Sequence, residues 1–143
     1  MKFDCKEISI SDDVFGCTLT LSEVKDNAAE QIGMSIKQLM SSSGKYLLLQ
    51  RTYPEDDFEN DYYYFETSDF DKAGELKNFK IELSKKIFLF KIDDDLFEIN
   101  IKYNKKEYNN LKKILVKLVN YKGQLLITDW AICTCNFYNE GED

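Results

Sequence analysis

The chain has 143 residues, of which 43% are hydrophobic and 31% charged, an ordinary balance for one folded domain. Its formal net charge is −7 and it contains no histidine, which excludes every catalytic triad and metal site that needs an imidazole. No apolar run approaches the roughly 20 residues of a membrane span, and the first residues lack the apolar core of a signal peptide, so we expect a cytoplasmic protein with reduced cysteines.

The first half of the chain shows mainly strand patterns. Residues 1–10 alternate apolar and polar side chains, and a phase shift at Lys6-Glu7 predicts a bulge. A turn is expected at 11–13, and the alternation over 14–22 predicts a second strand that completes a hairpin. A possible short helix within 26–41 has apolar residues at helical spacing. Further strands are expected at 45–53, buried on both faces, and at 62–67, with Pro54 between them.

The second half predicts a meander followed by a helix. Three alternating runs, at 78–84, 86–92 and 96–103, indicate antiparallel strands joined by short polar links. Asn104 and Glu107 have the spacing of a capping box, and the apolar stripe that follows predicts a long amphipathic helix over 104–122 that ends at Gly123. Strand character returns over 124–138, and 139–143 is expected to fray.

Together these elements predict a single α+β domain, 1–143. We expect a mainly antiparallel β-sheet of about seven or eight strands, with the long helix packed on one face.

The acidic charge is concentrated in one segment. Residues 54–71 hold eight acidic side chains and no basic one, whereas residues 72–123 hold thirteen basic and seven acidic side chains. One interpretation is a solvated loop and a charge-protected edge strand. The other is an acidic, aromatic face, including Tyr64, that binds a basic protein, because carboxylates speed encounter and tyrosines are frequent binding hot spots. The candidate partner-binding residues are Glu55, Asp56, Asp57, Phe58, Glu59, Asp61, Tyr62, Tyr63, Asp69 and Asp71, with the turn Asp93, Asp94 and Asp95.

No motif indicates a catalytic, metal or cofactor site. We interpret Cys5, Cys17, Cys133 and Cys135 as core residues and not as zinc ligands, because the Cys-x-x-Cys spacing is absent. The aspartates after Pro54 lack the glycine and the terminal glutamate of an EF-hand. Nucleic-acid binding is not expected, since the net charge has the wrong sign.

Several segments resemble the bacterial immunity proteins of polymorphic toxin systems, in the group known as immunity protein family 10. The resemblance begins at Lys2-Phe3, is strongest through the strand 46–51 that ends in Gln50-Arg51, and continues in 64–66, in Gly74, in the strand around 81–83 and up to about Gly123. The segment 24–43 is longer than the family pattern, and 124–143 lies beyond it.

The resemblance implies an α+β fold, no catalysis, and tight binding of a cognate protein toxin. It marks Gln50, Arg51, Glu66 and Gly74 as structural positions, and we interpret Arg51 and Glu66 as a structural ion pair across neighbouring strands. We therefore expect an immunity protein that neutralises its toxin by surface contacts, without a cofactor. The alternative is a small-ligand-binding or regulatory domain with a pocket between sheet and helix, lined by Phe88, Phe90 and Leu115. An enzyme would instead show a buried carboxylate pair in a cleft.

Overall fold

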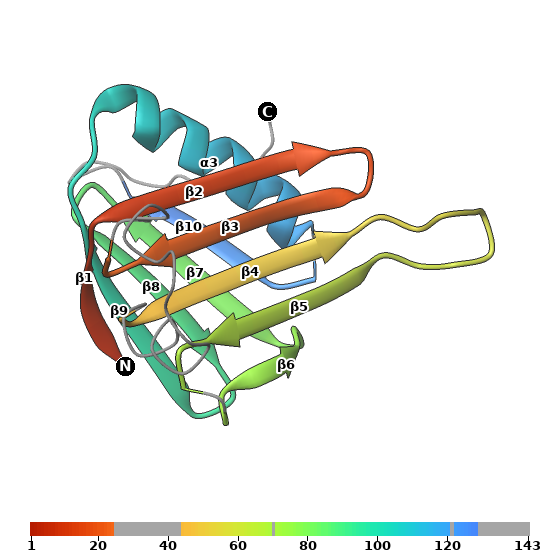
Figure 1. The fold of residues 1–143 in the computed structure, drawn as a ribbon, viewed down its shortest axis with the longest axis horizontal. Coiled ribbons are helices and arrows are strands. Elements are labelled where there is room, and N and C mark those ends of the chain that lie inside the picture. The colour runs from red at the N-terminus through yellow and green to blue at the C-terminus, as the bar shows by residue number, and fades with distance from the viewer. Residues whose placement is uncertain (25–43, 70, 121, 129–143) are drawn as a thin grey trace, which may run out of the picture.

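Ten strands and one helix make up the part of the chain that the computed structural model describes, which comprises residues 1–24, 44–69, 71–120 and 122–128. The strands form two five-stranded sheets, so the fold is α+β with two mainly antiparallel sheets. Figure 1 shows the two sheets stacked on one another, with the strands of one running across those of the other.

Sheet B, in front in Figure 1, is antiparallel throughout, and its strands lie in the order in which they follow along the chain. They are β2 (Glu7–Asp13), β3 (Gly16–Ser22), β4 (Tyr46–Thr52), β5 (Tyr62–Thr67) and β6 (Ala73–Glu75). Side chains alternate between its two faces: in β3, Cys17, Leu19 and Leu21 are fully buried, whereas Thr18 and Thr20 are half-buried. One face of sheet B therefore belongs to the core.

Sheet A, behind it, has the order β1-β9-β8-β7-β10. Its strands are β1 (Lys2–Cys5), β7 (Phe79–Ser84), β8 (Ile87–Ile92), β9 (Asp95–Ile101) and β10 (Gln124–Thr128). The three central strands form the predicted antiparallel meander. The two outer strands, β1 and β10, instead run parallel to β9 and β7, and such pairs cannot be joined by a tight turn.

The chain passes from sheet A to sheet B at Lys6, between β1 and β2. The amide of Lys6 donates to the carbonyl oxygen of Ser22 at 2.7 Å, and Ser22 is also the register partner of Glu7. Two successive residues thus share one partner, as in a bulge. The phase shift in the sequence marks the point where the strand bends from one sheet into the other.

The hydrophobic core lies between the sheets. Phe90 of β8 is at its centre, with its ring centroid 5.7 Å from that of Phe65 in sheet B and 5.5 Å from that of Phe97 in β9. Both sheets contribute fully buried aliphatic side chains, among them Leu49 and Ile81. At roughly 1.5–3 kcal/mol for each fully buried large apolar side chain, this shared core is what holds the two sheets together.

Helix α3 (Lys105–Val119) contacts β3 and β4 of sheet B and β10 of sheet A, so it packs against both sheets. Its start is the predicted capping box: the Glu107 amide donates to Asn104 Oδ1 at 2.8 Å, and the Asn104 amide donates to Glu107 Oε1 at 3.0 Å. It ends at Asn120, whose left-handed backbone lets its amide donate to the carbonyl oxygen of Val116. The buried face consists of Tyr108, Leu111, Ile114, Leu115, Leu118 and Val119.

Several predictions about the fold were wrong. The strands form two sheets and not one, they number ten in the described ranges, and the helix is shorter than 104–122. The first turn falls at Val14-Phe15 and not at 11–13, because β2 continues to Asp13. Strand β4 is buried on one face only. The possible helix within 26–41 and the residues after 128 lie outside the described ranges.

Candidate functional site

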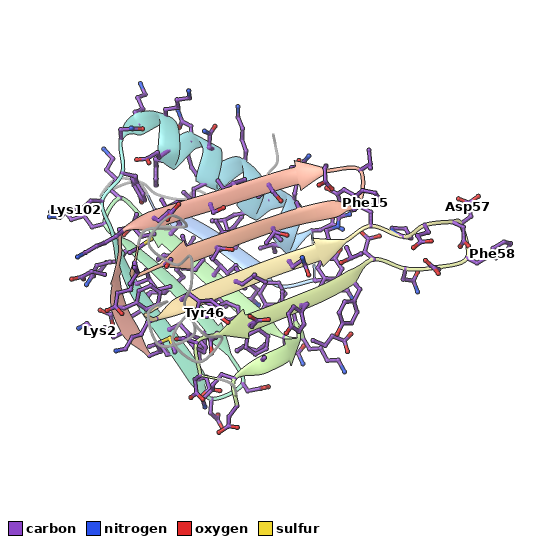
Figure 2. The ribbon with its side chains drawn as sticks, viewed as in Figure 1. Lys2, Phe15, Tyr46, Asp57, Phe58 and Lys102 are labelled. Carbon is purple, nitrogen blue, oxygen red and sulfur yellow. The ribbon has the colours of Figure 1, made fainter. Side chains whose placement is uncertain are left out.

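The loop between β4 and β5 projects beyond the body of the molecule (Figure 1). Its residues 55–59 include four carboxylates and Phe58, whose side chain is 95% exposed. Figure 2 shows Asp57 and Phe58 at the far end of this loop, pointing away from the sheets. A large aromatic ring thus stands in water among acidic groups, a position that costs free energy because the apolar ring stays hydrated.

Two of the four carboxylates hold the loop in shape. Asp56 Oδ1 accepts a hydrogen bond from the amide of Phe58 at 2.9 Å, and Glu59 Oε1 accepts one from the amide of Glu55 at 3.1 Å. Such side-chain contacts to nearby amides are typical of turns. The carboxylates of Glu55 and Asp57 make no hydrogen bond or ion pair to the described residues, so they are available to a partner.

A second exposed apolar group lies beside this loop, at the two-residue turn between β2 and β3. Val14 is 82% and Phe15 76% exposed, and the Phe15 carbonyl oxygen accepts a hydrogen bond from the amide of Tyr53 at 2.9 Å. A Cβ atom at Gly16 would lie 2.2 Å from the carbonyl oxygen of Arg51, so only glycine allows this close approach of β3 to β4.

We use the term tip surface for Val14, Phe15, Glu55, Asp57 and Phe58 together. Sequence reasoning missed its first two residues. It placed Phe15 inside a strand with Cys17 and Leu19, whereas the ring lies in the turn and points into solvent (Figure 2). The available signal in the sequence was the position of Val14-Phe15 directly between Asp12-Asp13 and Gly16, residue types that are frequent in turns.

Arg51 anchors the base of the β4–β5 hairpin. Its Nε donates to Asp61 Oδ2 at 2.5 Å, and its Nη1 donates to the carbonyl oxygen of Lys117, near the end of α3, at 2.9 Å. The guanidinium also lies over the rings of Tyr53, at 5.1 Å, and Tyr63, at 5.7 Å. A cation at the carbonyl end of a helix is favourable, so Arg51 ties the hairpin to α3.

A second link joins β2 to the same region. Lys117 forms an ion pair with Asp12, and the Tyr53 hydroxyl donates to Asp12 Oδ1 at 3.1 Å. The hydrogen bond from Lys117 lowers the pKa of Asp12. Burial is the largest cause that raises the pKa of Tyr53 to about 12, and contacts with Cys17 and Asp12 add to it. The base of the tip surface therefore keeps its charge pattern well beyond neutral pH in both directions.

The three consecutive tyrosines were predicted to lie on one acidic face, but side chains alternate along β5, so Tyr63 lies on the opposite face from Tyr62 and Tyr64. Tyr63 is only 4% exposed and its hydroxyl accepts a hydrogen bond from Asn120 Nδ2 at 2.8 Å, so its prediction as a partner contact was wrong. Tyr62 and Tyr64 lie on the outer face with their ring centroids 6.4 Å apart. Asp61 is held by Arg51 and is not a free surface charge.

The remaining acidic candidates lie away from the tip surface, around the β5–β6 and β8–β9 turns at the lower end of the molecule in Figure 1. They are Asp69, Asp71, Asp93, Asp94 and Asp95. Lys72 joins the two turns through a 2.6 Å contact with Asp95. The predicted acidic face is thus divided into two separate places.

Arg51 and Glu66 do not form the expected ion pair. Arg51 is opposite Tyr63 on the inner face of sheet B, whereas Glu66 is opposite Leu48 on the outer face. Glu66 instead accepts hydrogen bonds from the hydroxyl groups of Tyr46, at 2.5 Å, and Tyr64, at 3.1 Å. Burial, together with this bond to Glu66, raises the pKa of Tyr46 to about 12.

The other two motif residues have local roles. Gln50 Nε2 donates to Thr18 Oγ1 at 3.2 Å, which links β4 to β3 on the outer face. Gly74 has a φ of 151° in the short strand β6, and a Cβ atom there would meet no neighbour within 4 Å. The backbone conformation, and not close packing, accounts for glycine at this position.

The residues proposed to line a ligand pocket are part of the packed core. Phe88, Phe90 and Leu115 have no exposed surface, and Phe90 also packs against Phe79, with ring centroids 6.2 Å apart. These side chains fill the space between the sheets and do not line an opening to solvent.

The described cysteines also belong to the interior. Cys17 is fully buried and Cys5 half-buried, and burial raises the pKa of both thiols. Cys133 and Cys135 lie outside the described residues. Within the described ranges, no three histidine, cysteine, aspartate or glutamate side chains lie close enough to hold a metal ion.

No protein-family model, curated protein or solved structure matches this chain. Among the described residues, no helix is long and apolar enough to cross a membrane. The tip surface combines exposed apolar area with negative charge.

Proposed function

We propose that this protein is an immunity protein that binds a cognate bacterial toxin through the tip surface and neutralises it without catalysis. The observation that carries the proposal is Phe58, 95% exposed at the end of a projecting loop and flanked by the free carboxylates of Glu55 and Asp57. Phe15 and Val14, in the turn beside the base of the loop, add a second exposed apolar area.

The chemistry of these residues suits a basic protein surface. Burying a phenylalanine side chain on binding yields roughly 1.5–3 kcal/mol, and aromatic anchors of this kind commonly dominate interface energies. The carboxylates around it attract a cationic partner over several ångströms and so increase the association rate. A nucleic acid would be repelled, and a small molecule would find a convex surface instead of a pocket.

The choice of a toxin as the partner rests on the sequence resemblance to immunity protein family 10 alone. The strand ending in Gln50-Arg51 corresponds to β4, and the segment around Glu66 to β5, so the residues that carry the resemblance build the hairpin that presents the tip. A rigid base suits this role, because a loop already held in shape loses less entropy on binding.

The test looks for a toxin domain in the neighbouring reading frame and measures binding to that domain. Glu55→Lys combined with Asp57→Lys should slow association about tenfold or more at low ionic strength and weaken its salt dependence. Phe58→Ala should mainly raise the dissociation rate, also by about tenfold. Both variants should protect growing cells less well against the toxin.

The matched control is Asp71→Lys combined with Asp94→Lys, which makes the same change in net charge at the second acidic place. We expect it to leave both rate constants nearly unchanged. If instead the control slows association and the tip variants do not, the toxin binds at the β5–β6 and β8–β9 turns. Absence of any complex with the toxin domain would refute the immunity function itself.

A further inference from the structure

Strand β2 is an edge strand, so one side of its backbone has amide and carbonyl groups that are not paired with another described strand. Within the described residues it pairs with β3 on one side only. The two-residue turn makes Asp13 and Gly16 a hydrogen-bonded pair, so alternate residues of β2 direct their backbone groups toward β3. The backbone groups of Ile8, Ile10 and Asp12 then point away from the sheet. A second strand can pair there.

Helix α3 runs beside this open edge and leaves a groove of about 390 Å³ between them. The groove is lined by Ile10 and Asp12 from β2, and by Asn110, Lys113, Ile114 and Lys117 from α3. Ile10 is 37% exposed although it lies on the inner face of the sheet. Its apolar surface is therefore accessible to a chain lying in the groove.

Helix α3 carries a row of basic side chains along the side that borders the groove, and two of them, Lys113 and Lys117, line it. Lys106, Asn110, Lys113 and Lys117 follow one another at intervals of four, three and four residues, which places them on one side of α3. Lys117 is already paired with Asp12. Lys106 and Lys113 form no ion pair with any described residue, so their charges remain to be matched.

A second copy of this chain is a poor occupant. Antiparallel pairing of two β2 strands about Ile10 places Glu7 opposite Asp13 twice, and like charges directly opposite one another destabilise a strand pair. It also leaves the lysine row without carboxylates. The occupant that fits is an extended chain with acidic side chains at the right spacing.

We propose that β2 and α3 form a strand-accepting groove for an extended acidic segment of a partner protein. The segment's backbone pairs with Ile8, Ile10 and Asp12, as in other cases of strand addition at a sheet edge. Its inward side chains are two carboxylates with a small apolar residue between them, which packs on Ile10. One carboxylate contacts Lys106. The other contacts Lys113 and lies opposite Asp12, whose charge Lys117 already neutralises. This surface is distinct from the tip surface.

Simple geometry fixes the spacing. Lys106 and Lys113 are seven residues apart on a helix, about 10.5 Å along its axis. Side chains four residues apart on one face of a strand are separated by about 13 Å. Flexible lysines bridge this small difference. Two glutamates four residues apart, with valine midway between them, therefore match the groove.

The probe is a synthetic peptide with the sequence Thr-Glu-Thr-Val-Thr-Glu-Thr, blocked at both ends and titrated into the full chain. Amide NMR signals of Ile8, Ile10 and Asp12 should shift, and their hydrogen exchange should slow about tenfold or more at saturation. The peptide with lysine in place of glutamate should bind about tenfold more weakly at low salt, since two ion pairs are lost.

Two further comparisons separate strand addition from charge attraction. Lys106→Glu combined with Lys113→Glu should weaken binding about tenfold, whereas Lys102→Glu combined with Lys105→Glu, outside the lysine row, should not. N-methylation of one alternate set of peptide amides should abolish binding, and that of the other set should preserve it. The proposal fails if both methylated peptides bind equally, if neither unmethylated peptide shifts the β2 amides, or if those amides are already protected without peptide.

Discussion

Arg51 connects three elements at once, because its guanidinium reaches Asp61 before β5 and the Lys117 carbonyl oxygen in α3 from its own place on β4. It is the only arginine among nineteen basic residues. Burial works against its charge, but the hydrogen bond from Arg51 to Asp61 and the nearby tyrosines outweigh it, and the pKa of Arg51 is raised. A planar group with donors in several directions suits this position.

Replacing Arg51 by lysine should therefore destabilise the protein. One ammonium group cannot bond to both Asp61 and the Lys117 carbonyl, so we expect Arg51→Lys to lower the free energy of unfolding by about 1–2 kcal/mol. Urea denaturation measures this change.

The matched control is the exposed pair between Lys2 and Glu98, 3.5 Å apart. Lys2→Ala should cost less than about 0.5 kcal/mol. Equal losses for the two variants would mean that Arg51 is only another surface charge.

At the scale of elements, local pairings could be predicted from the sequence and distant ones could not. The hairpin of β2 and β3 and the meander of β7, β8 and β9 join neighbours in the chain, so alternation and turn signals indicate them. The parallel pair of β1 with β9 joins residues such as Phe3 and Ile99, and no local pattern encodes it. Strand β6 has only three residues and no apolar alternation.

The capped helix is an element whose start rests on identifiable contacts. Asn104→Ala removes the hydrogen bond to the Glu107 amide and should lower the free energy of unfolding by about 1 kcal/mol. Thermal or urea denaturation followed by circular dichroism checks this value.

Asn109 provides the control, since it is exposed inside the same helix. There the same change to alanine should stabilise by roughly 0.5 kcal/mol, because alanine has the higher helix propensity. A loss of stability at both positions would contradict the assigned cap.

The candidate site was partly predictable for similar reasons. Charge composition pointed to 54–71, and the exposed carboxylates of Glu55 and Asp57 lie there. The contribution of Phe15 depends on where the backbone turns, and the partner of Arg51 depends on where α3 packs. Both are set by tertiary structure. The misplacement of Tyr63 was avoidable, since the period of a strand separates neighbouring side chains.

On the scale of the whole molecule, the absence of histidine removes the side chain whose ordinary pKa lies nearest to neutrality. We therefore expect a flat stability profile between about pH 6 and 8. At higher pH the thiols of Cys5 and Cys17 and the hydroxyl groups of Tyr46 and Tyr53 all change stability in the same direction. Their folded pKa values are raised, so the folded state retains protons that the unfolded chain loses, and stability falls as pH rises.

The tyrosine contribution is present below their ordinary pKa of 10.0 and disappears as pH rises toward about 12. Tyr46→Phe and Tyr53→Phe should each reduce the alkaline loss of stability. At acidic pH the dependence has the opposite sign. The pKa of Asp12 is lowered in the folded state, so its contribution to stability is present above pH 3.8, the ordinary pKa. That contribution is lost as pH falls through the lower folded pKa. Urea denaturation across this pH range tests both limbs, and an alkaline limb unaffected by either tyrosine substitution would contradict the assignment.

The arrangement of the two sheets also has a consequence for protein synthesis. Sheet B is assembled from residues 7–75, which leave the ribosome early, whereas β1 at residues 2–5 must wait for β9 at residues 95–101. Until sheet A follows, the apolar face of sheet B with Leu19 and Leu49 has no partner layer. The nascent chain thus passes through an interval in which a large apolar surface is open to chaperones and to aggregation.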